Sequence, residues 1–562
     1  MKRIVIFTLV WFVFSLVQAF FTEIVDDEAY YWVYSRALDW GYFDHPPMIA
    51  LLIKMGYALF PGELGVRLLP SLLGAGTIFL VFLMLKDKVK DLRLLMLVSL
   101  SIPLVHSHVA GPLAIPDLPL VFFATLFFYF YKRYLDKETP LIIFMLGLSI
   151  TLMLYSKYNG FLVIGFTILS NLKLLTRRSF WVLVAISVTL YLPHILWQVK
   201  HDFVSFGYHL VDRNAPFEFK YLVEYIGNQI LMVGPFCWVI LIYLGFARKA
   251  ENKFELALKF NLFGFFLGFM ISSLKGHVEP HWTAFAIVPL IMLSVPEIDK
   301  RMRLKKWVLV LSYLTLPLIF LLRLFVITDI GILPEPLSHR FLHKKEYYLQ
   351  IKEGAGDRPV VFTNSYQHPS LYWYFTKDPS FSRNDRFYRR NQYDLMNMEA
   401  ELQGKEVLYF TRIAFPGVDS LKTTRSTAMV YNITYYGTFN RVEISLPDME
   451  WDFEIGEMVQ VDLELINPTD RTISFSDSCS FKPSLIYTYY SEKQKGRAFF
   501  AKYENKLPDL APGEHVIFPV KIRVPYVPGK YQVMISFGAE YLPAGLNGRP
   551  VKMTVHSRSK AN

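Results

Sequence analysis

Three consecutive acids follow the first apolar run of this chain. Asp26, Asp27 and Glu28 come shortly after residues 4–21, which are almost entirely apolar. A carboxylate at a membrane surface can act as general base towards a hydroxyl or an amine. Its partner at that depth would be an electrophile carried by a lipid. The alternative is a helix N-terminus, where acids cap the helix and favour its positive end. A cap explains one acid better than three.

A second polar motif, GYFDHPP at residues 41–47, follows a run of aromatic residues. Asp44 and His45 are placed at a turn that Pro46 makes rigid. His45 could donate a hydrogen bond to a phosphate, or join Asp44 as a metal ligand, or be a simple turn residue. The aromatic residues that precede the motif also fit a belt at the membrane interface.

Isolated charges in the apolar part are the next candidates. Lys157 is flanked by apolar segments, and a lysine at membrane depth is costly and usually functional, although it can also extend to the interface. Asp117 lies between two prolines, where it could cap a helix or take part in a site. Arg67 begins an apolar segment and could meet a phosphate or anchor the helix at the interface.

A run of His277, Glu279 and His281 lies in another polar loop. Metal ligands four residues apart need a helix, and Pro280 disfavours one. His277 or Glu279 could still complete a metal or substrate site, with Asp44 as a further metal ligand. A divalent metal ion therefore stays an open expectation.

The composition indicates a membrane protein with a more polar remainder. Of the 562 residues, 53% are hydrophobic and 16% are aromatic, which is unusual for a soluble enzyme of this length. The net charge of +11 fits short cytoplasmic loops, and without a basic stripe bearing aromatics no nucleic-acid partner is expected. The chain has two cysteines, Cys237 and Cys479, so neither a disulfide framework nor a cysteine zinc site is expected.

The spacing of the apolar runs predicts about eleven transmembrane helices. Residues 4–21 are long for a signal peptide and are interpreted as the first helix. The other runs lie at 67–85, 94–110, 118–131, 140–155, 158–172, 179–197, 222–247, 256–274, 282–297 and 307–327.

Basic loops give the orientation. With a cytoplasmic N-terminus, the basic loops 86–93, 132–138, 173–178, 248–253 and 299–306 all fall on the cytoplasmic side, as lysine and arginine usually do. The acid-rich loop 22–66, the turn near Lys157, the loop at 198–221 and everything after about residue 328 then face outward.

The outward part is expected to contain two further domains. Residues 1–328 would form the transmembrane domain, and residues 329–428 a small α/β domain with short apolar strands around a helix. Residues 429–562 alternate polar and apolar side chains between turn signals, which is typical of an Ig-like β-sandwich.

The DEAYYW…GYFDHPPM combination resembles the polyprenyl-phosphate-dependent glycosyltransferases of the GT-C type in glycosyltransferase family 39. These include protein O-mannosyltransferases and the lipid A aminoarabinose transferase. The family likeness extends through AIPDLPLVFF at 114–123, YSKYNGFLV at 155–163, HVEPHWTAFAIVPL at 277–290 and RRNQYDLM at 389–396. The C-terminal sandwich falls outside the family pattern.

The resemblance implies an inverting transfer from a polyprenyl-phosphate-linked sugar to a protein, lipid A or another envelope glycan. Asp27 would be the general base, Glu28 would assist or orient it, and Asp117 would join the catalytic group. Lys157, His45 and Arg67 would hold the donor phosphate, with His45 standing where the aminoarabinose transferases have lysine. Family members differ in their need for a metal.

Two other function classes remain as rivals. A transporter or flippase of lipid-linked sugar precursors would also place polar residues in a multi-span bundle, but transporters often show internal repeats and midplane charges. A sensor or adhesin would use the outer sandwich and leave the acidic loop unexplained. The unusual residues gather at one membrane face, which favours an enzyme. We expect a multi-pass protein of a bacterial inner membrane, with its C-terminal domain in the periplasm.

Overall fold

A computed structural model describes residues 1–209, 217–328, 341–446, 450–475, 481–491 and 494–557. The chain divides into two compact units, Met1–Lys344 and Lys345–Asn562. The expected domain boundary at residue 328 adjoins residues 329–340, which lie outside the described residues.

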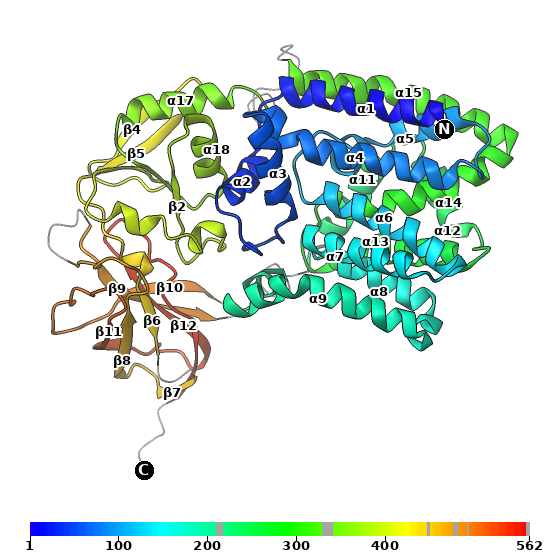
Figure 1. Cartoon of the computed structure of the whole chain (residues 1–562). Coiled ribbons are helices and arrows are strands. Elements are labelled where there is room, and N and C mark those ends of the chain that lie inside the picture. Colours follow the sequence, from blue (N-terminus) through cyan, green and yellow to red (C-terminus); the bar gives the residue numbers. More distant parts are fainter. Residues whose placement is uncertain (210–216, 329–340, 447–449, 476–480, 492–493, 558–562) are drawn as a thin grey trace. The chain divides into compact units, whose positions relative to one another are not determined.

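The first unit is helical. Figure 1 shows α1 and α15 side by side, with α2 and α3 at the end where α1 stops. Its helices are α1 (Lys2–Phe21), α2 (Asp26–Arg36), α3 (Met48–Leu59), α4 (Glu63–Leu85), α5 (Leu92–Leu100), α6 (Asp117–Asp136), α7 (Pro140–Ser156), α8 (Gly160–Ser170), α9 (Arg178–Lys200), α10 (Val204–Gly207), α11 (Phe219–Val233), α12 (Trp238–Ala247), α13 (Lys253–Ser272), α14 (Ile287–Lys300) and α15 (Met302–Ile327).

The expected number of about eleven spans is not confirmed. In the part of the chain that is described, six helices are long and apolar enough to cross a membrane, or seven if α11 and α12 form one span. The run at 222–247 is not one straight helix, because α11 and α12 meet at an angle of 98°. Gly234 lies at this break with a φ of 126°, a conformation that glycine adopts most readily. Helices α7 and α8 are apolar but have only 17 and 11 residues.

The second unit begins with a mixed sheet. Its strands are β1 (Val360–Thr363), β2 (Phe381–Arg383), β3 (Val407–Phe410), β4 (Asp419–Lys422) and β5 (Thr427–Ile433), in the spatial order β2-β1-β3-β5-β4. Strand β1 runs parallel to both β2 and β3, and β5 runs antiparallel to its neighbours. All side chains of β1 and β3 are buried, as expected for strands covered on both faces. The unit also contains helices α17 (Lys344–Ala355), which begins at the last residue of the first unit, and α18 (Gln367–Thr376).

Two more sheets follow, in the orders β10-β9-β12-β13-β7 and β11-β8-β6. Along β8, Val461, Leu463 and Leu465 are buried and alternate with more exposed residues, the period of a strand with one covered face. The two sheets meet where the Tyr489 hydroxyl of β9 donates to the carbonyl of Arg523 in β11. The Ig-like topology is not confirmed. The strands are β6 (Glu443–Ser445), β7 (Glu450–Glu454), β8 (Met458–Ile466), β9 (Ser484–Ser491), β10 (Gln494–Phe500), β11 (His515–Arg523), β12 (Gly529–Gly538) and β13 (Val551–His556).

Candidate active site

Glu28 and Arg67 form a fully buried ion pair. Arg67 Nη2 lies 2.5 Å from Glu28 Oε2, and Arg67 Nε donates to Glu28 Oε1 at 2.8 Å. The guanidinium also donates to the carbonyl oxygens of Ala19, Thr22 and Glu23 at the end of α1. Glu28 further accepts from the backbone amides of Val25 and Ala114. These contacts join α1, α2, α4 and the segment before α6, so both charges are committed to positioning these elements.

The other two acids of the first motif have different surroundings. Asp26 accepts from Lys344 Nζ at 2.7 Å, and that lysine is buried. Asp27 is exposed in the first turn of α2. It lies next to Glu28, so the buried ion pair fixes the helix turn that presents the Asp27 carboxylate. Of the three acids, Asp27 is the most exposed.

The aromatic residues of α2 pack inside the unit. Tyr30, Tyr31, Trp32 and Tyr34 are each at most 7% exposed, which does not fit a belt facing lipid. The Tyr34 hydroxyl donates to the Asp44 carboxylate, and its ring stacks on Tyr42 with centroids 4.2 Å apart. The turn at residues 41–47 is thereby held against α2.

His45 is enclosed by this turn. Its ring packs edge-on against Tyr31 at 5.5 Å and lies 6.3 Å from the ring of His209. Burial lowers the pKa of His45 to about 3, and the nearby charges of Asp44 and Lys157 act in opposite directions. His45 is therefore neutral at pH 7. Its Nδ1 atom is buried and has no hydrogen-bond partner among the described residues.

A second buried ion pair lies nearby. Lys157 Nζ is 2.8 and 2.9 Å from the two carboxylate oxygens of Asp117. Asp117 opens α6 after Pro116, and Lys157 follows the last residue of α7, so two helix ends bring the charges together. His281 Nε2 is 3.9 Å from Asp117 Oδ2, and the His281 ring stacks on His108 at 4.4 Å.

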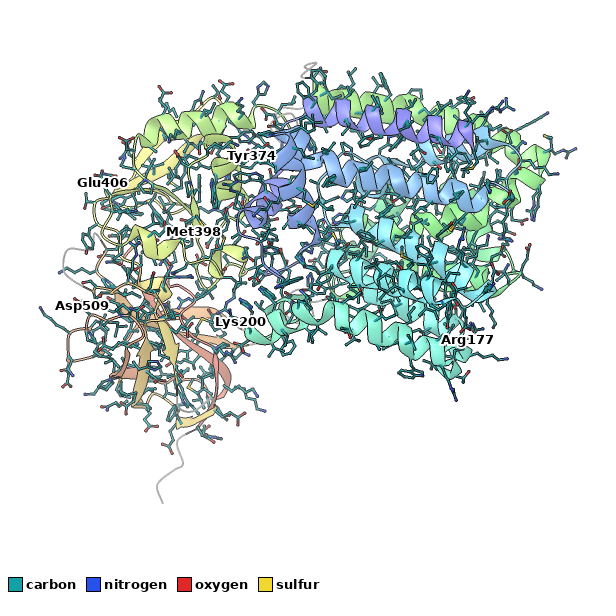
Figure 2. All side chains as sticks on the ribbon, in the orientation of Figure 1. Arg177, Lys200, Tyr374, Met398, Glu406 and Asp509 are labelled. Carbon is teal, nitrogen blue, oxygen red and sulfur yellow. The ribbon has the colours of Figure 1, made fainter. Side chains whose placement is uncertain are left out.

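Helix α9 and the residues that follow it contact the segment from Asp39 to Asp44. Trp197 Nε1 donates to Asp39 at 2.8 Å, and His194 Nδ1 lies 2.6 Å from the Trp40 carbonyl. The Ser205 hydroxyl donates to the Tyr42 carbonyl, and His209 Nε2 lies 2.9 Å from the Asp44 carbonyl. Figure 2 labels Lys200 at this end of α9 and Arg177 at the opposite end. The first part of the loop at 198–221 thus contacts the 41–47 turn, whereas residues 210–216 lie outside the described residues.

The expected metal ligands do not form one set. His277 Nδ1 lies 3.3 Å from Glu224, and its Nε2 lies 3.8 Å from Glu279, whereas Asp44 accepts from Tyr34. Among the described residues, no group of three or more His, Cys, Asp or Glu side chains is arranged to hold a metal ion. The metal stays a prediction.

The contacts of His108 with His281 and of His209 with Asp44 were not predicted from the sequence. The expectation that Pro280 disfavours a helical metal site at 277–281 stays a prediction, and it did not reveal the contact of His281 with Asp117. Pro280 begins a 3-10 helix that places His281 in its first turn. His209 gave no signal because its contact with Asp44 joins residues 165 positions apart.

Several known proteins resemble this chain in sequence or in fold. A family model described as dolichyl-phosphate-mannose-protein mannosyltransferase matches residues 44–197, which include Asp44, His45, Asp117 and Lys157. Lipid A galacturonosyltransferase RgtD from Rhizobium johnstonii is 23% identical over 232 residues, covering 40% of this chain and 49% of that protein. The match therefore spans about half the length of this curated relative.

Two solved structures share the fold. ArnT from Cupriavidus metallidurans in the apo state matches with a TM-score of 0.53 at 13% identity, covering 76% of this chain and 97% of ArnT. The same protein bound to undecaprenyl phosphate matches with a TM-score of 0.55 at 12% identity, covering 76% and 98%. These similarities confirm the resemblance to GT-C type glycosyltransferases that the first-loop motif carries.

Proposed function

We propose that this protein transfers a sugar from a polyprenyl-phosphate donor to an envelope acceptor, which is a protein, lipid A or another glycan. The observation that carries the proposal is the buried Asp117–Lys157 pair beside a neutral His45. It lies within a fold shared with ArnT, one structure of which is described as bound to undecaprenyl phosphate. A buried lysine next to helix ends suits a phosphate held at the surface of a membrane.

Lys157 and His45 hold the donor phosphate in this mechanism. Lys157 has three N–H donors, so it can contact a phosphate oxygen while Asp117 fixes its position. Neutral His45 donates a hydrogen bond from one ring nitrogen without the cost of burying a second cation. Contacts of this kind contribute about 1.5–3 kcal/mol each, and they strengthen as charge builds on the leaving phosphate.

Asp27 acts as the general base. It removes the proton from the acceptor hydroxyl or amine, whose oxygen or nitrogen forms a bond to the anomeric carbon. The bond between that carbon and the phosphate oxygen breaks on the opposite face, so the anomeric configuration inverts. The polyprenyl phosphate leaves with the bonding electrons, and the proton stays on Asp27. Glu28 and Arg67 position this base and do not touch the substrate.

The membrane arrangement is part of the proposal. The N-terminus is cytoplasmic, and the site faces the outer side of a bacterial inner membrane. The shorter helices among α5 to α8 complete the set of about eleven spans. Residues 345–562 lie in the periplasm, and the sheets after residue 429 serve as an accessory domain for an acceptor or partner.

The test is mass spectrometry of envelope glycolipids and glycoproteins from cells with Asp27→Asn or wild-type protein. Loss of one sugar mass from one species in the mutant would support the proposal and identify both donor sugar and acceptor. Glu63→Gln is the matched control, since Glu63 lies in the same loop, at the start of α4, and loses the same charge. An Asp27→Asn profile equal to wild type, with both proteins folded, would favour transport of a lipid-linked precursor instead.

A further inference from the structure

The second unit has a topological switch point at its parallel strands. Strands β1, β2 and β3 end at Thr363, Arg383 and Phe410. The chain passes from β1 to β2 on one side and then returns to β3 on the other side of β1. In open parallel sheets, ligands bind outside the carboxyl ends of the strands at such a point. Here Arg412, after β3, donates to the carbonyl of Asn364, after β1, at 3.3 Å.

Four arginines gather at this edge, which we call the carboxyl edge and define as residues 364–366, 384–390 and 411–412. Arg386, Arg389 and Arg390 follow β2, and Arg412 follows β3. The Arg389 guanidinium lies 4.6 Å from the ring centroid of Tyr366, so the loop after β2 folds back over the residues after β1. The loop after β2 and the loop after β3 therefore both place arginine residues at the carboxyl edge.

In the described part of the chain, three of these arginines make no direct ion pair, although the Asp385 and Asp394 carboxylates act electrostatically on Arg386 and Arg390. Arg386, Arg390 and Arg412 make no ion pair within 4.0 Å among the described residues. The Nε and Nη1 atoms of Arg386 are buried without a hydrogen-bond partner in the same part of the chain. Buried polar groups are rarely left unpaired, and an unpaired buried charge is costly.

The carboxylates of Asp385, at this edge, and of Asp394, shortly after it in the chain, already accept hydrogen bonds from amide groups. Asp385 accepts from the backbone amides of the following turn at 2.8 and 3.1 Å and from Asn364 Nδ2 at 2.6 Å. Asp394 accepts from the Asn391 amide at 2.7 Å and from Asn384 Nδ2 at 2.8 Å. These bonds stiffen the loop after β2 and occupy carboxylate oxygens, so the two acids act on Arg386 and Arg390 without direct contact.

We propose that the carboxyl edge binds the phosphate monoester of a sugar headgroup, separately from the transfer site in the first unit. Guanidinium groups match phosphate oxygens in a bidentate manner better than lysine does. Phe387 is 62% exposed beside Arg386 and gives an apolar face for the sugar ring. The source of the phosphate sugar is either a free molecule or a glycolipid headgroup.

The test uses the full chain in phosphatidylcholine nanodiscs and measures the Kd of glucose 1-phosphate, with glucose as the uncharged probe. Arg412→Gln and Arg386→Gln are each expected to raise the Kd about 10-fold or more, since a charge-assisted hydrogen bond is lost. Lys405→Gln is the matched control, because this exposed lysine precedes β3 at the opposite edge of the sheet. Arg412 is exposed, so its variant is expected to fold even where Arg386→Gln does not.

A second arm identifies the source. Vesicles with phosphatidic acid, which carries a phosphate monoester, replace glucose 1-phosphate and are tested with the same variants. Binding of either probe that is weakened by Arg412→Gln but not by Lys405→Gln supports the site, and the probe that binds names the source. Binding of neither probe above the level of glucose, or equal binding by Arg412→Gln and wild type, would overturn the proposal.

Discussion

Replacing Lys157 by methionine would leave the Asp117 carboxylate buried without its counter-charge. At 2.8 Å, two unit charges attract by about 6 kcal/mol at an effective dielectric constant of about 20. Desolvation offsets part of this attraction, but removal of one partner from a buried pair typically costs about 3–5 kcal/mol. We expect Lys157→Met and Asp117→Asn each to lower the free energy of unfolding by this amount. The double variant should lose less than the sum of the two single losses.

In this set of variants, the effect on the free energy of unfolding can be distinguished from the effect on sugar transfer. The free energy of unfolding is measured by SDS titration in mixed micelles, and sugar transfer is measured on the same preparations. The double variant is expected to recover much of the stability, because no unpaired charge remains, but not the transfer. Loss of one phosphate contact of about 1.5–3 kcal/mol corresponds to a rate about 10- to 150-fold lower.

Two results would refute this reasoning. Strictly additive losses in the double variant would mean that the two charges are not coupled, contrary to the contact between Lys157 and Asp117. Transfer by the double variant at the wild-type rate would leave the ion pair as a purely structural element, and the phosphate would have to be held elsewhere.

Three further outcomes are expected. Arg67→Met should cost about 3–5 kcal/mol, because Glu28 loses its buried partner, and should appear as loss of monodisperse protein in size-exclusion chromatography. Burial lowers the pKa of His45 to about 3, so only the unfolded chain takes up this proton as the pH falls below about 6.5. The loss of thermal stability between pH 7 and pH 5 should therefore be smaller in His45→Gln than in wild type. Burial raises the pKa of Glu399, which accepts from the Tyr436 hydroxyl, so its favourable contribution is present at low pH and lost as the pH rises. Glu399→Gln should then gain thermal stability relative to wild type at pH 8 but not at pH 4.

Local features could be predicted where one stretch of chain decides them. The apolar runs at 4–21, 179–197 and 307–327 correspond to α1, α9 and α15, because the length of an apolar run decides whether it can span a bilayer. Alternation within residues 429–562 likewise predicted strands, and β8 (Met458–Ile466) is one of them. The first-loop motif was sufficient to indicate the GT-C type family.

Features that depend on contacts between distant residues could not be predicted in this way. Arg67 was expected to meet a phosphate, but its guanidinium contacts Glu28 and the end of α1. No local pattern shows where a long cationic side chain will find its partner.

The membrane character and the resemblance to GT-C type glycosyltransferases follow from the sequence by itself, since composition and short motifs carry them. Only the tertiary structure decided which acid is exposed and which is buried in an ion pair, and that His281 approaches Asp117. The physical reason is that burial and charge pairing depend on which helix ends meet, and packing of the whole bundle sets this.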